Sequence, residues 1–411
     1  MSLLADCFRE QMKKSKDYRM SSEAEFDVAY PTGFLGFDFL NGSIVNVRAN
    51  NVSYGYYSVG IVDGSINTLI GRSGCGKTTF GVQVSKNIIN NFTDTCMYID
   101  AVEGGITYNR LSNLTGWDGP TVKERIIYRN AGITAENFYQ RLKLIHDLKL
   151  ANRDKLTYDT GKVDTQGSPV YKLVPTPYIL DSLAMLMPET YTNENELAGQ
   201  MAATAAAKTN TRILKTLVPM LKSANILLLL INHINQKVDI NPYARTKSQV
   251  SYLKPDETLP GGNAAIYLAN NIIRFDDTKL KSNEGFCIEG SLVTLSLVKS
   301  RTNKAGRTVN LIFCQDTGFD ADLSLYTLLK DAGIIKGAGA FYHIEGCDTK
   351  FTQKTFKDKL KTDPEIRDAF INAAIDYLTK SITPKVDVDN FNSFEVTNSL
   401  INKLNDIQIA A

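Results

Sequence analysis

The middle of the chain alternates between short apolar runs and longer segments with helical periodicity. Four runs show the pattern: "SINTLIG" (65–71), "TCMYIDA" (95–101), "TPYILDSLAML" (176–186) and "NILLLLINHI" (225–234). Their nearly continuous apolar character is typical of strands that are buried on both faces. The segments between them, such as 202–224, have the length and spacing of amphipathic helices. The alternation predicts an α/β fold with a mainly parallel sheet flanked by helices.

The two ends of the chain differ from its centre. Residues 1–45 combine a short amphipathic segment with one candidate strand, which predicts an arm, and residues 46–320 hold the alternating pattern of a core. From 321 to 411 the periodicity is mainly helical, which predicts a small C-terminal lobe. Two turn-rich stretches predict insertions: 46–60 a hairpin or a loop, and 158–174 a hairpin.

Composition narrows the class of protein without naming a partner. Of 411 residues, 43% are hydrophobic and 22% are charged, so a large core is expected and global disorder is not. The net charge of +2 neither marks nor excludes a nucleic-acid binder, because binding needs only a local basic surface. Six scattered cysteines indicate a reduced, cytoplasmic compartment. Apolar runs stay far below the about 18 residues that a membrane span needs, so no membrane partner is expected.

The stretch "GRSGCGKT" (71–78) matches the GxxxxGK[ST] pattern of phosphate-binding loops between a predicted strand and a predicted helix. Its glycines let backbone N–H groups converge on phosphate oxygens, and the helix N-terminus adds the positive end of its dipole. ATP with Mg²⁺ is the expected ligand: the lysine would contact the β- and γ-phosphates, and the threonine after it would hold the metal ion. The residues expected to contact nucleotide are Gly71, Ser73, Gly74, Cys75, Gly76, Lys77, Thr78 and Thr79.

Two further carboxylates would complete such a site. Asp181 ends the apolar run "YIL", where a second metal-side carboxylate is expected at the carboxyl end of a strand. Glu103 follows the strand "YIDA", and a carboxylate there can face the γ-phosphate and orient water. Asp100, within that strand, is the alternative, and sequence spacing leaves both carboxylates open.

Seven blocks occur in order across residues 31–380. They are "PTGFLGFDFLNG", "YIDAVEGGIT", "ILDSLAMLMPE", "LLLLINHI", "LPGGNAAIYLANNIIRF", "LVKSRTNKAGRTVNLIF" and "LLKDAGIIKGAGAFYHIEG". In this order they resemble the RecA-type strand-exchange recombinases, and among these the phage UvsX-type branch. The resemblance implies a RecA-type P-loop ATPase core, an N-terminal arm that contacts a neighbouring protomer, and a small helical C-terminal lobe.

The resemblance also implies roles for individual residues. Glu103 would be the catalytic glutamate, and His233, after "IN", would contact the γ-phosphate and report its loss. Tyr108 would stack on adenine. Lys299 and Arg301, in "VKSR", would reach the ATP of a neighbouring subunit, which makes nucleotide binding and assembly one equilibrium.

Two segments correspond to DNA-binding loops in the family. The first, 187–200, is acidic and is not expected to contact phosphates. The second, 235–262, combines basic residues with a glycine pair that lets backbone amides approach phosphates. The residues expected to contact DNA at this loop and just after it are Arg245, Lys247, Gly261, Gly262 and Asn263.

The expected function is ATP-dependent homologous recombination and DNA repair. The protein would form a helical filament on single-stranded DNA, exchange strands with double-stranded DNA and hydrolyse ATP. The resemblance implies a bacteriophage protein that works with a single-strand-binding protein and a loading mediator. Two alternatives stay open. One is a hexameric RecA-fold helicase or translocase, which shares the ATPase core, and the other is a nucleotide-dependent adaptor without strand exchange.

Overall fold

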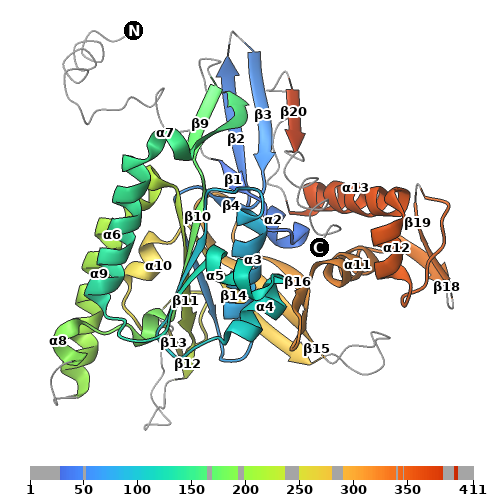
Figure 1. Cartoon of the computed structure of the whole chain (residues 1–411). Coiled ribbons are helices and arrows are strands. Elements are labelled where there is room, and N and C mark those ends of the chain that lie inside the picture. Colours follow the sequence, from blue (N-terminus) through green and yellow to red (C-terminus); the bar gives the residue numbers. More distant parts are fainter. Residues whose placement is uncertain are drawn as a thin grey trace.

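The computed structural model describes nine stretches of the chain: 28–49, 52–163, 169–192, 199–236, 250–279, 290–338, 341–345, 347–382 and 393–396 (Figure 1). Two predicted DNA contacts, Arg245 and Lys247, lie outside these residues. So do residues 1–27 of the predicted arm. The described residues include the whole of the predicted phosphate loop.

A sheet of nine strands forms the centre of the molecule. The six strands from β14 to β7 run parallel, and β15, β16 and β17 continue the sheet antiparallel. This arrangement confirms the predicted α/β class with a mainly parallel sheet. In spatial order the strands are β17 (Gly318–Asp320), β16 (Arg307–Cys314), β15 (Gly290–Ser300), β14 (Asn271–Lys279), β5 (Ile66–Gly71), β11 (Ile226–His233), β10 (Thr176–Asp181), β6 (Met97–Ala101) and β7 (Ile126–Arg129).

Helices cover both faces of the parallel strands (Figure 1). Strand β11 shows why: Leu227 and Leu229 belong to one buried cluster, whereas Leu228 and Leu230 belong to the other. Each fully buried leucine contributes about 1.5–3 kcal/mol relative to exposure, so both faces need a cover. One face packs on α3 (Lys77–Ile89), α4 (Tyr108–Thr115) and α5 (Gly119–Arg125), and the other on α6 (Ala135–Ala151) and α9 (Gly199–Ala224).

The described part of the predicted arm packs into this core. Strand β1 (Ala29–Tyr30) pairs with β4 (Ile61–Val62), and most of α2 (Leu35–Asn41) is buried against β16 and the C-terminal lobe. The hairpin expected at 46–60 is β2 (Ser43–Ala49) with β3 (Val52–Ser58), and β20 (Ser393–Val396) adds to β3 in parallel.

The C-terminal lobe has its own buried cluster, built around aromatic residues such as Tyr326, Phe356 and Phe370. As predicted, it is mainly helical, and it also contains one hairpin (Figure 1). Its elements are α11 (Ala321–Asp331), β18 (Ile335–Ala338), β19 (Phe341–Ile344), α12 (Phe356–Thr362) and α13 (Pro364–Ser381).

The second expected hairpin is also present, and an ion pair and a hydrogen bond connect it to the core. Lys172 Nζ lies 2.8 Å from Asp63 Oδ2, and the Tyr158 hydroxyl donates to Tyr30 Oη at 2.9 Å. The hairpin consists of β8 (Thr157–Val163) and β9 (Pro169–Leu173), and it follows α7 (Arg153–Leu156).

The short elements that remain follow the carboxyl ends of β10 and β11 or lead into β14. They are the 3₁₀ turn η2 (Leu183–Met185), α8 (Glu189–Thr192), the antiparallel pair β12 (Asn235–Gln236) and β13 (Glu257–Thr258), and α10 (Ala264–Leu268). Among the described residues, no helix combines the length and apolar character that crossing a membrane requires.

Candidate nucleotide and metal site

The phosphate loop joins β5 to α3, as predicted. Gly74 and Gly76 have φ values of +83° and +85°, a left-handed conformation that glycine adopts without strain. A Cβ on Gly76 would lie 2.9 Å from the Phe319 ring, so the position has no room for a side chain. The turn brings the backbone N–H groups at the start of α3 toward the space where phosphates would bind.

Cys75 is the inward-facing residue of this loop. Its side chain is buried, and Sγ lies 2.9 Å from the Arg72 carbonyl oxygen, to which it donates. Burial raises the pKa of the Cys75 thiol. The cysteine therefore contributes to the packing of the loop, which agrees with its small size and does not require a reactive thiolate. Ser73 and Gly74, by contrast, are exposed.

Lys77 is buried at 4% exposure and donates to two carbonyl oxygens of its own loop. Nζ lies 3.0 Å from the Gly71 oxygen and 2.6 Å from the Arg72 oxygen. A negatively charged oxygen attracts the lysine ammonium group more strongly than a neutral carbonyl oxygen does. Phosphate oxygens would therefore compete well with these two carbonyls for the lysine.

Thr78 and Asp181 meet although 103 residues separate them. The Thr78 hydroxyl donates to Asp181 Oδ2 at 2.6 Å. Burial raises the pKa of Asp181, the hydrogen bond from Thr78 opposes that shift, and the nearby charge of Glu103 adds to it. A hydroxyl and a carboxylate are the oxygen ligands that Mg²⁺ takes together with nucleotide phosphates. The pair fits the predicted metal role.

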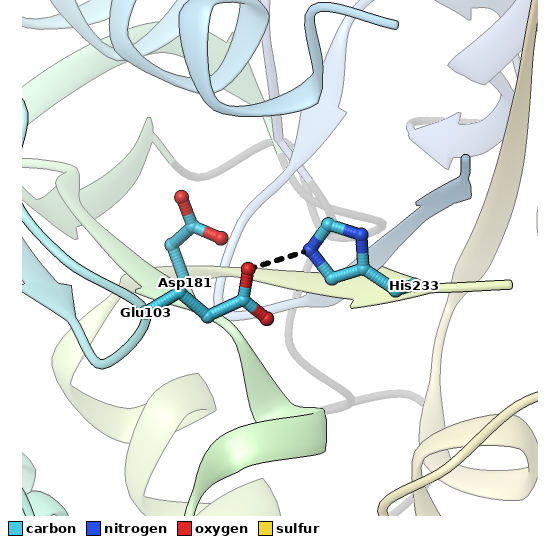
Figure 2. Close-up of side chains that lie close together, drawn as sticks. All are labelled: Glu103, Asp181 and His233. Atoms are coloured by element: carbon cyan, nitrogen blue, oxygen red, sulfur yellow. Dashed lines mark ion pairs between the residues drawn. The ribbon is translucent and has the colours of Figure 1, made fainter. Parts of the chain in front are cut away.

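Glu103, Asp181 and His233 form one cluster at the carboxyl edge of the sheet (Figure 2). Glu103 follows β6, Asp181 ends β10 and His233 ends β11, and these strands are neighbours. One ligand atom from each residue lies within 4.8 Å of the others. His233 Nε2 is 2.9 Å from Glu103 Oε2, and the Ser182 hydroxyl donates to Glu103 Oε1. The edge where parallel strands end is where α/β folds bind ligands.

Asp100 has a different environment from Glu103. Its side chain is fully buried, and it accepts two hydrogen bonds of 3.2 Å from Arg129. Arg141 and the Tyr178 hydroxyl also donate to it. These donors occupy both carboxylate oxygens. Of the two carboxylates that the sequence left open, Glu103 is therefore the one placed beside Asp181 and His233.

The predicted adenine contact, Tyr108, is the first residue of α4 and is 51% exposed. Its ring packs edge-on against Tyr128, with ring centroids 6.3 Å apart. The ring is thus half exposed and in contact with one other aromatic residue, and its predicted stacking on adenine stays a prediction.

Lys299 and Arg301 lie at the end of β15 and contact α10 of the same chain. Lys299 Nζ donates to the carbonyl oxygens of Ile266, Tyr267 and Ala269, and Arg301 Nη2 donates to that of Tyr267. They are not part of the cluster of Glu103, Asp181 and His233 in their own chain. Their predicted contact with the ATP of another subunit stays a prediction.

The structure describes residues 235–236 and 250–262 of the second predicted DNA loop, and these include β12 and β13. Gly261 and Gly262 have φ values of +89° and +92°. A Cβ on Gly261 would lie 3.0 Å from Leu183 Cγ, and one on Gly262 would lie 3.1 Å from the Ala207 carbonyl oxygen. Asn263 follows them and precedes α10. The glycine pair thus lets the backbone pass close to η2 and α9.

Sequence reasoning missed two residues that join these parts. Ser182 holds Glu103, and its place directly after Asp181 in "ILDS" was the available signal. Asn232 joins strand β11 to the second predicted DNA loop: its Oδ1 accepts from the His233 backbone N–H at 3.0 Å, and its Nδ2 donates to the Pro260 carbonyl at 2.8 Å.

No model of a known protein family matches this chain. A curated protein from Chloroherpeton thalassium, named Protein RecA, is 26% identical to it over 189 residues. That match covers 45% of this chain and 48% of the relative, so the chain spans about half the length of the curated relative it matches. The chain is distantly similar to RecA. The similarity to RecA supports the RecA-type relationship that the seven sequence blocks indicated, and it agrees with the α/β core described above.

Proposed function

We propose that this chain is an ATPase of RecA type that assembles as a helical filament on single-stranded DNA and exchanges strands with double-stranded DNA. The observation that carries the proposal is the meeting of Thr78, Asp181, Glu103 and His233 beside the phosphate loop. These are the groups that ATP hydrolysis needs: ligands for a metal ion, a carboxylate for water, and a donor for the γ-phosphate.

Each residue has one task in the proposed hydrolysis. The N–H groups at the start of α3 bind the phosphates, and Lys77 turns from its loop carbonyls to the β- and γ-phosphate oxygens. Thr78 and Asp181 would hold Mg²⁺, which neutralises phosphate charge when bound. Glu103, held by Ser182, orients the attacking water and accepts its proton.

His233 connects this chemistry to DNA in the proposal. It lies against Glu103, where it can donate to the γ-phosphate, and its backbone N–H is held by Asn232. The Asn232 side chain also binds the Pro260 carbonyl, directly before Gly261 and Gly262. A shift of His233 on loss of the γ-phosphate can therefore reach the end of the DNA loop. It would pass through the peptide bond to Asn232 and the hydrogen bond from Asn232 to Pro260.

Assembly as a filament is supported by the open edge of the sheet. Strand β7 (Ile126–Arg129) is the terminal strand, and its outer edge has no partner strand among the described residues. Such an edge can accept a strand from a second copy of the chain. In the proposal that strand comes from the arm, and Lys299 and Arg301 of each copy reach the ATP of the next. The same proposal includes the N-terminal arm. It also makes the chain a cytoplasmic phage protein of the UvsX-type branch that works with a single-strand-binding protein and a loading mediator.

The test is D-loop formation with ATP, Mg²⁺, homologous duplex and single-stranded DNA. Wild-type protein is expected to pair the strands, and Lys77→Ala is expected to lose both pairing and ATP turnover. Lys123→Ala, an exposed lysine on α5, is the matched control and should behave as wild type.

Electron microscopy with single-stranded DNA and a non-hydrolysable ATP analogue separates the alternatives. Extended helical filaments support the proposal. Closed rings that unwind forked duplex without pairing strands would replace it with the hexameric helicase. Protein that binds nucleotide but neither single-stranded nor double-stranded DNA would support the nucleotide-dependent adaptor instead.

A further inference from the structure

Lys299 uses all of its donors within its own chain. Its ammonium group has three N–H donors. They reach the carbonyl oxygens of Ile266 at 2.6 Å, Tyr267 at 2.9 Å and Ala269 at 3.0 Å. Arg301 adds a fourth contact, from Nη2 to the Tyr267 oxygen at 2.7 Å. We call these four contacts the clasp.

The clasp satisfies the end of α10. This helix has five residues (Ala264–Leu268), so its last carbonyl groups have no partner within the helix. Cations at a helix C-terminus satisfy such carbonyls and interact favourably with the negative end of the dipole. The clasp therefore fixes where α10 ends and where the chain turns toward β14 in the centre of the sheet.

The start of α10 directly follows the second predicted DNA loop. Pro260, Gly261 and Gly262 lead into it, and Ala264, Ala265 and Ile266 are buried against the core. Asn232 binds Pro260 at one end of this segment, and the clasp binds the other end. The segment between the second DNA loop and the sheet is thus held at two points. Asn232, next to His233, holds one end and Lys299 holds the other, and both His233 and Lys299 are expected to contact ATP.

The clasp has neutral acceptors for two cations. Burial lowers the pKa of Lys299, and the positive charge of Arg301 lowers it further. The four contacts end on three carbonyl oxygens, which attract cations less strongly than ionised oxygens do. A polyanion that came within reach would therefore compete for the lysine. A phosphate contact would cost Lys299 at least one of its three carbonyl partners, because no donor is left over.

We propose that Lys299 has two mutually exclusive positions, on the carbonyl groups of α10 in a free protomer and on the triphosphate held by a second copy of this chain in the filament. Arg301 keeps other N–H donors beyond Nη2 and can bridge both positions. Moving Lys299 releases the end of α10 in the same protomer that binds DNA. Binding of ATP in one subunit is thereby coupled to the DNA loop of its neighbour. This inference rests on the proposed function for the trans contact alone; the clasp itself does not depend on it.

The first test measures the clasp in free protein. Hydrogen exchange of residues 264–275 is followed at a concentration where sedimentation shows monomer, without nucleotide or DNA. Lys299→Met is expected to speed exchange there on the order of tenfold, because the end of α10 loses three hydrogen bonds. Lys304→Met, an exposed lysine in the adjoining turn, should leave exchange unchanged. Lys299→Gln, which keeps an amide donor, should fall between and serves if the methionine variant does not fold. Unchanged exchange in both Lys299 variants would overturn the clasp.

The second test locates Lys299 in the assembled state. A cryo-electron microscopy structure of the filament with a non-hydrolysable ATP analogue, Mg²⁺ and single-stranded DNA is expected to show Nζ at a phosphate of the neighbouring protomer and away from at least one α10 carbonyl. Nζ bound to all three carbonyl oxygens in that filament would overturn the proposed second position of Lys299. If no filament forms and no D-loop is made, the proposed function fails instead, and the exchange result still decides the clasp.

Discussion

Asp100 lies within β6 and Glu103 lies just after it, three residues on, and the fold gives the two carboxylates opposite environments. Asp100 is fully buried between Arg129, Arg141 and Tyr178. Glu103 leaves the strand and lies 2.9 Å from His233, beside Asp181. One carboxylate therefore holds the edge of the sheet together, and the other is placed for chemistry.

Replacing Glu103 by Gln should remove turnover and leave the fold intact. Glutamine keeps the size of the side chain and can still accept from Ser182, but it cannot take a proton from water. General-base groups contribute about 10²–10⁴ in rate, so DNA-stimulated ATP hydrolysis should fall by at least about 100-fold. Affinity for a fluorescent ATP analogue should stay within about twofold, since the rate step and not ground-state binding is affected.

Asp100→Asn is the matched control, and we expect it to lower the stability of the fold, which Glu103→Gln leaves intact. It leaves Arg129 and Arg141 without their anion; breaking a fully buried pair costs about 3–5 kcal/mol, and because both arginines are partly exposed, about 1–3 kcal/mol is expected here. Urea unfolding should show that loss of stability. A well-folded but inactive Asp100→Asn together with an active Glu103→Gln would reverse the assignment.

Ser182→Ala tests whether Ser182 positions Glu103. Its hydroxyl donates to Glu103 Oε1, so alanine lets the carboxylate change its orientation. A misplaced catalytic group lowers the rate, and about tenfold is expected in kcat with KM for ATP nearly unchanged. Ser182→Thr keeps a hydroxyl and should restore most of the rate. Equal losses in the alanine and threonine variants would point to a packing role and not to the hydrogen bond.

Thr78→Val should weaken the binding of Mg²⁺ that ATP hydrolysis requires. Valine has nearly the shape of threonine but lacks the hydroxyl that lies 2.6 Å from Asp181. The Mg²⁺ concentration for half-maximal ATP hydrolysis should rise about tenfold or more, since one of the expected protein ligands is lost. Thr78→Ser retains the hydroxyl and should stay near wild type. A valine variant with an unchanged Mg²⁺ midpoint would exclude Thr78 as a ligand.

The local parts of the fold were predictable from the sequence because local rules produce them. The strand–loop–helix at residues 65–89 follows from an apolar run, glycines with left-handed φ and a helix start. Strands β10 and β11 follow from their continuous apolar residues, and their carboxyl ends brought Asp181 and His233 to one edge as parallel pairing requires. The two inserted hairpins also appeared where turn residues indicated them.

Contacts between distant residues could not be predicted in this way. Asp100 is structural because of Arg129, Arg141 and Tyr178, which are 29, 41 and 78 residues away. The short strand β7 has no periodicity long enough to mark it, and pairing with β6 defines it. The clasp of Lys299 depends on the carbonyl groups at the end of α10, and backbone groups leave no trace in the residue pattern.

Asp38 should make the stability of the fold fall as pH rises from about 4 to about 7. Burial raises the pKa of this carboxyl from 3.8 to about 7, against the opposing effect of the two hydrogen bonds from Thr32 to Oδ1. In this window the unfolded chain has released the proton that the folded chain still holds, so each step up in pH favours unfolding, and the effect levels off above pH 7. A shift of about three units corresponds to at most about 4 kcal/mol.

Asp38→Asn stays neutral and can accept the same two hydrogen bonds, so its unfolding free energy in urea should lack this decline between pH 5 and 7.5. Asp376→Asn, an exposed carboxyl on α13, controls for the lost charge and should retain the wild-type decline. Parallel curves for wild type and Asp38→Asn would show that Asp38 is ionised in the folded protein throughout this range.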